Sequence, residues 1–359
     1  MKKIIRIITT SQYPYDQRLR KVAIVLEDIG YEVHITDRSK GNYSGEINTI
    51  FKRGFLFYME YNVRVFFISL FTPGETFYVA DIDPMPAIIL LSFFRKHQII
   101  LDLHEWFPEV PELEGARVKK NIWRFIERFS FRVANIIVTV NDSLSEIYYK
   151  NYGRKPIVVR NIPLLRRKVR VNGRKKNFEN RIIYYQGAVN TGRGLEAAIE
   201  AMKWLPNWKL WIVGDGDILD SLKNTASIST ARERIIFWGR KKTDELDNLM
   251  AEATVGINLL ESNSANYYYS LANKFFDYMM MGIPSINMNF PEYRRLIKKI
   301  DSGYLLEKLD ARDLAKLVLS IEYDEYESKV DNCVRASKVY NWEIESEKLK
   351  MAVNSYLKT

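Results

Sequence analysis

Short β-branched runs alternate with helical patterns along almost the whole chain, and this alternation restricts the fold more than any other feature. Strands separated by helices form parallel sheets, because the connection between two parallel strands must cross one face of the sheet. The first half carries six predicted strands: Ile4–Thr9, Glu32–Thr36, Thr76–Ala80, Gln98–Leu103, Asn135–Val140 and Ile157–Val159. The second half carries five: Arg181–Gln186, Lys209–Val213, Arg234–Trp238, Val255–Leu259 and Pro284–Met288. We therefore predict an α/β protein with two halves of similar size.

The segment Pro163–Asn180 interrupts the alternation. It is rich in Arg, Lys and Asn and poor in apolar residues, a composition typical of an interdomain linker with a loop. We expect a first domain at 1–163 and a second at 164–339. Ligands of open parallel sheets bind beyond the carboxyl ends of the strands, so we expect the site in a cleft between the domains.

The composition narrows the class of protein. The single cysteine, Cys333, excludes a disulfide framework and fits a reducing compartment. Met1-Lys2-Lys3 leads straight into the first strand without a secretory signal, and apolar runs such as Met85–Phe94 are too short to span a bilayer. We expect a soluble cytoplasmic protein.

The formal charge of +10 indicates an anionic partner, which is a nucleic acid, an anionic lipid or a phosphorylated small molecule. Nucleic acid is the weakest of these hypotheses. The chain has no zinc-finger spacing or RNA-binding signature, and its aromatic residues are not interleaved with Arg on one face.

An apolar helical run near residue 275 carries a narrow polar face. Asn273, Lys274 and Asp277 fall at i, i+1 and i+4, followed by Gly282-Ile283-Pro284. A buried helix rarely places three polar side chains on one face unless they have partners. A ligand with hydroxyls and anionic oxygens would suit all three. The alternative is a helical Lys274–Asp277 ion pair worth about 0.2–0.5 kcal/mol.

A glycine-containing loop follows the first strand of the second half. It runs from Gln186 through Gly187 and Arg193 to Gly194, and a helix is predicted from Leu195. Glycines let a backbone approach a ligand, and an Arg fork suits a diphosphate, although a solvated Arg in an ordinary turn is the alternative. The motif is not a P-loop, because Gly-Lys-Ser/Thr is absent.

Two further turns, at Val213-Gly214-Asp215-Gly216 and Trp238-Gly239-Arg240, also follow strands. A nucleobase could lie against their backbone, while simple turn chemistry explains each of them alone.

Two places in the first half offer further candidates. His104 and Glu105 follow a buried strand that contains Asp102, and nearby acids could orient His104 or raise its pKa. Arg18 lies after the first strand, where it reaches a cleft anion or belongs to a charge cluster at the start of a helix. No Gly-x-Gly-x-x-Gly follows the first strand, which argues against a dinucleotide-dependent oxidoreductase.

The run Arg117–Val133 predicts a basic amphipathic helix. Its apolar stripe is Val118, Ile122, Phe125, Phe129 and Val133, and the basic residues Lys119, Lys120, Arg124 and Arg128 lie largely outside that stripe. Either the stripe packs on the core with a solvated basic face, or the helix contacts an anionic membrane surface.

These motifs resemble those of the GT-B glycosyltransferases of family 4, the retaining nucleotide-sugar transferases, over nearly the whole chain. The family carries an acidic residue five positions before a Gly-x-Pro on its donor-binding helix, and Asp277 has that spacing from Gly282-Ile283-Pro284. Further similar elements are Asp102-x-His104-Glu105, Asp16-x-Arg18, Asn161 and the loop from Gly187 to Gly194. Two positions differ: Tyr269 replaces a glutamate, and Ala188 replaces a basic residue.

The resemblance implies two facing Rossmann-like domains, the first for the acceptor and the second for the donor, with the helix within 340–359 packing back on the first. It implies that Asp277 holds the donor ribose, that Arg193 pairs with the diphosphate, and that His104 contacts the sugar or acceptor. The implied catalytic residues are these three. The implied donor-binding residues are Gly187, Arg193, Gly214, Gly216, Asn273, Lys274 and Asp277, and the implied acceptor-side residues are Arg18, His104 and Glu105.

The implied function is retaining, metal-independent transfer of a sugar from a nucleotide-sugar to a glycan or lipid-linked acceptor in cell-surface polysaccharide assembly, such as capsule or lipopolysaccharide. The nucleotide-sugar would be a co-substrate rather than a cofactor, and the enzyme would work in the cytoplasm at the inner face of the membrane. Two alternatives share the fold: a nucleotide-sugar epimerase, and a non-catalytic partner subunit, with which Tyr269 in place of an acid is compatible.

Overall fold

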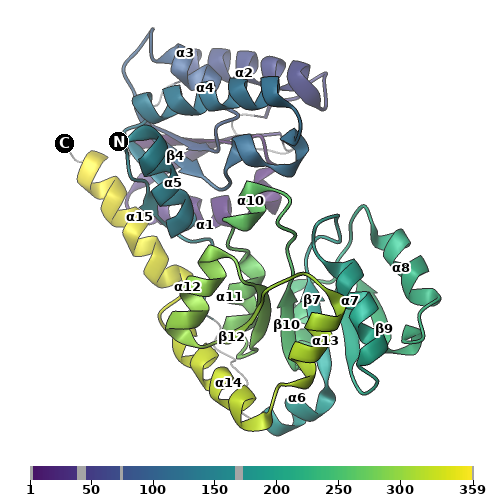
Figure 1. Ribbon diagram of the computed structural model, residues 1–359. Helices are drawn as coiled ribbons and strands as arrows, with labels where there is room; N and C mark the ends of the chain where they lie inside the picture. The colour runs from purple at the N-terminus through teal and green to yellow at the C-terminus, as the bar shows by residue number, and fades with distance from the viewer. Residues whose placement is uncertain (1–2, 39–45, 73–75, 166–172, 358–359) are drawn as a thin grey trace. The chain divides into compact units, whose positions relative to one another are not determined.

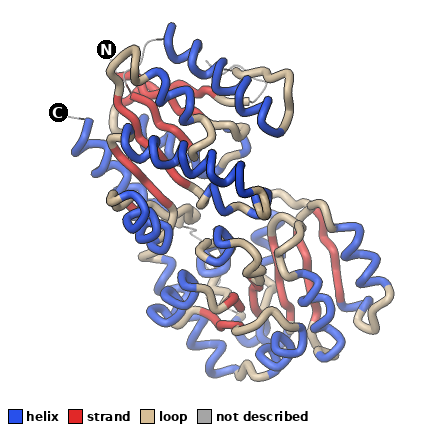
Figure 2. The backbone as a smooth tube through the Cα atoms, turned by 45° about the horizontal axis from the view of Figure 1, so that its top comes forward, coloured by secondary structure: helices blue, strands red, loops and turns tan. Residues whose placement is uncertain are grey.

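The computed structural model describes residues 3–38, 46–72, 76–165 and 173–357. The chain divides into two compact units, one formed by Met1–Asn161 with Ile344–Thr359 and the other by Ile162–Glu343. Figures 1 and 2 show that each unit contains a parallel sheet with helices packed against it. The predicted α/β class is confirmed.

The first unit is built on a six-stranded sheet with the strand order β2-β1-β3-β4-β5-β6, in which all pairs are parallel. The strands are β1 Lys3–Ile8, β2 Tyr31–Thr36, β3 Thr76–Ala80, β4 Gln98–Leu103, β5 Ile136–Thr139 and β6 Ile157–Val158. All six predicted strands are confirmed. The chain adds β2 on one side of β1 and β3 on the other, so the sheet has a topological switch point between β1 and β3.

The helices of the first unit include one from the far end of the chain. They are α1 Gln17–Asp28, α2 Gly54–Phe71, α3 Met85–Leu91, α4 Arg117–Val133, α5 Asp142–Tyr152 and α15 Trp342–Leu357. Arg160 joins α5 to α15, because its guanidinium contacts Asp142 at 2.5 Å and Glu345 at 3.2 Å. Leu349 and Val353 of α15 are buried.

The second unit has a six-stranded parallel sheet with the order β12-β11-β10-β7-β8-β9. The strands are β7 Ile182–Gln186, β8 Lys209–Val213, β9 Ile235–Gly239, β10 Val255–Asn258, β11 Ser285–Met288 and β12 Gly303–Leu306. The five predicted strands are confirmed, and β12 was not predicted. Its four residues include no β-branched side chain and end in two leucines, which favour helix at least as strongly as strand.

The helices of the second unit are α6 Arg174–Asn180, α7 Leu195–Ala201, α8 Leu219–Ser227, α9 Thr243–Met250, α10 Ala265–Tyr268, α11 Asn273–Met280, α12 Pro291–Ile300, α13 Ala311–Leu319 and α14 Tyr323–Ser337. The interpretation of 163–180 as linker and loop is wrong for its last part, which is α6. Phe178 of α6 packs against Tyr323 and Tyr326 of α14, and this contact holds the polar segment as a helix. Residues 166–172 of the predicted linker lie outside the described residues. Across the described ranges, no helix combines the length and apolar character needed to cross a membrane.

Candidate functional site

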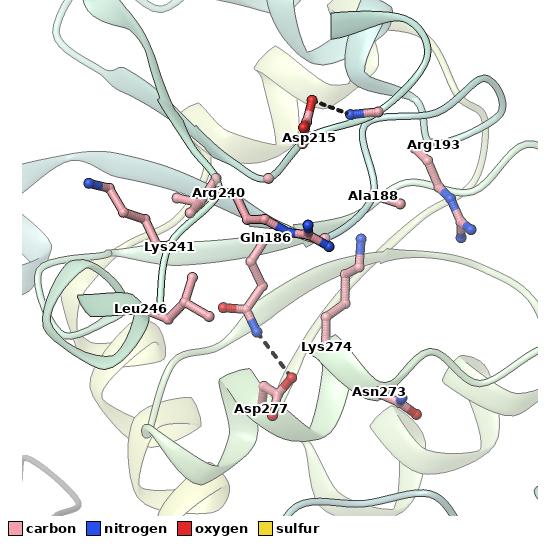
Figure 3. Close-up of a pocket in the computed structure, with 14 residues that line it drawn as sticks. Gln186, Ala188, Arg193, Asp215, Arg240, Lys241, Leu246, Asn273, Lys274 and Asp277 are labelled. Carbon is pink, nitrogen blue, oxygen red and sulfur yellow. Dashed lines mark hydrogen bonds between the residues drawn. The ribbon is translucent and has the colours of Figure 1, made fainter. Parts of the chain in front are cut away.

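A pocket of about 830 Å³ opens at the carboxyl ends of β7, β8 and β9 in the second unit. It lies beside the switch point of this sheet, where the chain adds β8 on one side of β7 and β10 on the other. Its walls come from the loops after the three strands and from α9 and α11. The lining residues are Gln186, Gly187, Ala188, Arg193, Val213, Gly214, Asp215, Gly216, Arg240, Lys241, Leu246, Asn273, Lys274 and Asp277 (Figure 3).

Glycines form one wall of this pocket, because the backbones of the turns after β7 and β8 are in direct contact there. Gly214 has φ +145°, and a Cβ on it would lie 1.9 Å from the carbonyl oxygen of Gly187. A Cβ on Gly216 would lie 2.3 Å from the carbonyl oxygen of Val189. Neither position accepts a side chain without moving the other turn, so the backbone itself forms this wall.

Helix α11 contributes the polar face that its sequence predicts. Phe275, Phe276 and Met279 are buried, Asn273 is exposed, and Lys274 and Asp277 line the pocket.

Asp277 accepts a hydrogen bond of 3.0 Å from Nε2 of Gln186, the last residue of β7 (Figure 3). The Nζ of Lys274 lies 3.8 Å from the ring centroid of Tyr185, and within the described part of the chain it has no ion pair. No salt bridge joins Lys274 to Asp277 among the described residues, although the carboxylate still attracts the ammonium.

The pocket holds three cations that form no salt bridge among the described residues: Arg193, Arg240 and Lys274. The guanidinium of Arg193 lies 5.1 Å from the ring centroid of Tyr267, and its Nε is buried without a hydrogen bond in the described structure. Burial, and then the charge of Arg193, lower the pKa of Lys274 well below its usual value. The second cause shows that Lys274 and Arg193 repel each other. An anion bound between them would remove that repulsion.

A buried polar network in the first unit surrounds the carboxylate of Asp102 on β4. Arg18 of α1 donates to both carboxylate oxygens, from Nε at 2.8 Å and from Nη2 at 2.7 Å. The hydroxyl of Tyr78 donates at 2.6 Å, and Nε2 of His104 lies 3.0 Å from the same carboxylate. Arg18 and Asp102 are only 2% and 0% exposed, so this ion pair is shielded from water.

His104 is placed between two carboxylates. Besides Asp102, its Nδ1 lies 3.5 Å from Asp81, whose other oxygen accepts the backbone N–H of His104 at 2.8 Å. Burial lowers the pKa of His104, but Asp81 and Asp102 outweigh it and raise the pKa to about 9. His104 is therefore a cation at neutral pH, and in that state it cannot serve as a general base. The 3.5 Å contact of Nδ1 is at the limit of a hydrogen bond, which leaves this N–H able to bind a ligand oxygen.

Comparison with protein families identifies the second unit. Residues 167–339 match the family described as glycosyl transferases group 1. This unit is a group 1 glycosyl transferase domain. The predicted resemblance to family 4 is confirmed, and the protein is a glycosyltransferase. Curated proteins give no match.

Solved structures resemble this group 1 glycosyl transferase over its whole length. Sucrose-phosphate synthase from Thermosynechococcus elongatus has a TM-score of 0.83 at 15% identity, over 99% of this chain and 100% of its own. Anabaena HepE in complex with UDP-glucose has a TM-score of 0.75 at 12% identity, over 98% of this chain and 99% of its own. WaaG, a glycosyltransferase involved in lipopolysaccharide biosynthesis, has a TM-score of 0.71 at 13% identity, over 99% of this chain and 100% of its own. These likenesses confirm the predicted GT-B fold.

The structure of this group 1 glycosyl transferase brings together all seven residues predicted for the donor, because each of them lines the one pocket. Sequence reasoning gave no donor role to Gln186, which orients Asp277, and treated Arg240 only as part of a turn. A polar residue ending a strand could have signalled Gln186. The contact of Gln186 with Asp277 spans 91 positions and has no local signal.

The three residues predicted for the acceptor lie in different surroundings. His104 is partly accessible and Glu105 is exposed. Arg18 is buried, and its remaining Nη1 donates to the carbonyl oxygen of Val159 at 2.8 Å. Its donors are directed into the protein, so Arg18 holds Asp102 and, through it, His104. The described residues contain no group of three His, Cys, Asp or Glu side chains able to hold a metal ion.

Proposed function

We propose that this glycosyltransferase moves a sugar, with retained anomeric configuration, from a nucleoside diphosphate sugar to a glycan or lipid-linked acceptor of a cell-surface polysaccharide such as capsule or lipopolysaccharide. The observation that carries the proposal is the pocket lined by a carboxylate that Gln186 holds and by three cations that form no salt bridge with any described residue. The UDP-glucose of HepE and the role of WaaG in lipopolysaccharide biosynthesis are in keeping with it. We place the reaction in the cytoplasm, at the inner face of the membrane.

The diphosphate would bind where Arg193, Lys274 and the first turn of α11 meet. The ammonium of Lys274 lies 3.3 Å from the place of a Cβ on Gly187, beside Ala188. A basic residue often occupies position 188 in the family, so Lys274 supplies a cation to the same part of the pocket from another element. The N-terminus of α11 has no side-chain cap, and its free amides favour an anion.

The nucleoside would bind on the other side of the pocket. The carboxylate of Asp277 can accept hydrogen bonds from two ribose hydroxyls, and Gln186 fixes its orientation. The base would lie against the glycine backbone of Gly214 and Gly216, with Leu246 beneath it. Asn273, exposed at the start of α11, would contact the diphosphate or the sugar.

In the proposed reaction, the bond between the anomeric carbon and the diphosphate oxygen breaks while the acceptor oxygen bonds to that carbon on the same face. The acceptor proton passes to the departing diphosphate. Arg193 and Lys274 stabilise the charge that develops on that leaving group, so positioning and fixed charge provide the catalysis. On the first unit, His104 and Glu105 would contact the sugar or acceptor, with His104 as a cationic hydrogen-bond donor.

A thermal-shift screen with nucleoside diphosphates and their sugars tests this function. A ligand at about 100 times its Kd adds about 2.7 kcal/mol, which raises Tm by about 5–11 °C for a unit of this size. Arg193→Ala and Asp277→Ala should abolish the shift without unfolding the protein, whereas Arg232→Ala, an exposed site of the same unit, should preserve it.

No shift with UDP, GDP, ADP or dTDP would refute the proposal. Conversion of a donor to its epimer without an acceptor would replace the proposed reaction by epimerisation. Donor binding without transfer or hydrolysis would leave only a binding subunit.

A further inference from the structure

Two tyrosine rings lie against two of the cations that line the pocket of Figure 3. The guanidinium carbon of Arg193 is 5.1 Å from the ring centroid of Tyr267, and Nζ of Lys274 is 3.8 Å from that of Tyr185. Both distances are those of a cation–π contact, in which the negative face of the ring attracts the cation. Because neither cation forms a salt bridge among the residues that the structure describes, each contacts a ring rather than a carboxylate.

The loop that carries Arg193 is in close contact with the segment that carries Tyr267. A Cβ on Gly192, which has φ +83°, would lie 3.0 Å from the Tyr267 ring, and the N–H of Glu261 donates to the carbonyl oxygen of Gly192 at 3.0 Å. On the other side of Arg193, a Cβ on Gly194 would lie 2.3 Å from the carbonyl oxygen of the residue that follows β10. A side chain at either glycine would therefore move Arg193 away from the ring.

Each ring is also fixed by bonds other than its contact with the cation. The N–H of Tyr267 donates to the hydroxyl of Ser264 at 3.3 Å, and its carbonyl oxygen accepts from the hydroxyl of Ser270 at 2.8 Å. The hydroxyl of Tyr185 donates to the carbonyl oxygen of Ala188 at 2.6 Å, and its side chain is buried. The rings are therefore rigid supports for the two long basic side chains.

The two pairs belong to one cluster. Burial raises the pKa of Tyr185, while the charge of Arg193 opposes this rise and Tyr267 adds to it. The charge of Arg193 also acts on Lys274. Electrostatic effects of this kind require short separations, so both rings and both cations surround the same part of the pocket.

A ring holds a cation differently from a carboxylate. A carboxylate neutralises the charge and accepts hydrogen bonds from the N–H groups, whereas a ring attracts the cation and does not take up the donors at its edge. Phosphate oxygens are acceptors that need such donors. The Nε of Arg193 is buried and makes no hydrogen bond within the described structure, so it is one such donor.

We propose that Tyr267 and Tyr185 are positioning residues of this pocket, which hold Arg193 and Lys274 in place and leave their N–H groups for the diphosphate of the donor. The proposal rests on the proposed function, because it takes a diphosphate as the anion that binds there. Neither tyrosine belongs to the pocket lining, so each ring acts through its cation rather than by touching the ligand.

Calorimetric titration of the full chain with UDP, GDP, ADP, dTDP and their nucleosides tests the proposal. Tyr267→Leu should weaken binding of the diphosphate that wild type binds by about 5–30-fold, because the cation–π contact is lost. Binding of the matching nucleoside should change by less than about 2-fold. Tyr267→Phe keeps the ring and should bind both ligands as wild type does.

The adjacent tyrosine of α10 provides a matched control. The ring of Tyr268 packs on Phe290, at a centroid distance of 5.1 Å, and not on a cation of the pocket. Tyr268→Leu removes the same side chain from the same helix, so it should leave the affinity for the diphosphate unchanged even where it lowers the melting temperature.

A second pair of variants tests Tyr185. Tyr185→Phe and Tyr185→Leu both lose the hydrogen bond to Ala188, so the difference between them measures the ring alone. The Leu variant should bind the diphosphate at least about 5-fold more weakly than the Phe variant. Tyr267 is only partly buried, and its pair of variants decides the proposal if Tyr185→Leu does not fold.

Leu variants that bind the diphosphate as tightly as the Phe variants would overturn the proposal and leave the proposed function standing. Equal weakening of diphosphate and nucleoside binding would show that the rings support the pocket as a whole, and it would also overturn the proposal. A wild-type protein that binds none of the four diphosphates would refute the proposed function, and this proposal with it.

Discussion

Replacing Arg18 by Met should destabilise the first unit strongly. The bidentate Arg18–Asp102 pair is 2% and 0% exposed, so the variant leaves a buried carboxylate without its main counter-charge. Removing one partner of a buried pair costs about 3–5 kcal/mol. We expect the lower value, because His104 and Tyr78 still bind Asp102. A loss of about 3 kcal/mol lowers Tm by about 6–12 °C in a unit of this size.

Differential scanning calorimetry of the full chain measures the loss. Arg20→Met is the matched control, because this exposed arginine lies on the same helix and should change stability by less than about 0.5 kcal/mol. Equal effects of the two substitutions would refute the reasoning. A stable Arg18→Met variant that lost only substrate affinity would show that Arg18 contacts a ligand, as the sequence suggested.

Three further predictions concern single side chains. Lys274→Met should weaken nucleoside diphosphate binding about 10–100-fold in calorimetric titration and leave nucleoside binding unchanged; equal weakening of both would contradict a phosphate contact. The pKa of His104 is raised from 6.5 to about 9, so its contribution to stability, about 3 kcal/mol, is full below pH 6.5 and is lost as pH rises through 9. Urea unfolding should show that the difference in free energy of unfolding between wild type and His104→Gln shrinks between pH 6.5 and about 9. A difference that stays constant over this pH range would exclude the ion pairs of His104 as the source of the stability. Gly214→Ala should destabilise the second unit by more than about 3 kcal/mol, whereas Gly239→Ala, with φ +65° and nothing within 4 Å, should cost about 1–2 kcal/mol by the same measurement.

The positions of most helices and strands were predictable from the sequence, whereas the contacts between distant elements were not. Strands such as β4 were predictable because β-branched residues recur between helical patterns, while β12 lacks such residues. The periodicity of α4 identified an apolar stripe but not whether another element covers it. That depends on α2 and α3, which are distant in sequence.

The same limit applies to the candidate site. Local spacing was enough to propose Lys274 and Asp277, which lie on one helix turn. Arg18 is buried because it pairs with Asp102, which lies 84 positions away in the sequence. An arginine at the start of a helix has the same local sequence whether its side chain points into the protein or into solvent. Long-range pairs of this kind decide which predicted residues face a ligand.

The attachment of α15 to the first unit has a consequence for biosynthesis. The second unit is a continuous stretch of chain, whereas the first is interrupted by it and resumes at Ile344. On the ribosome, the second unit can therefore complete its folding before Ile344 and the rest of α15 emerge. Until then, the first unit lacks the buried Leu349 and Val353, and Arg160 has no Glu345 to bind. The unit that begins first in the chain is thus the one that matures last.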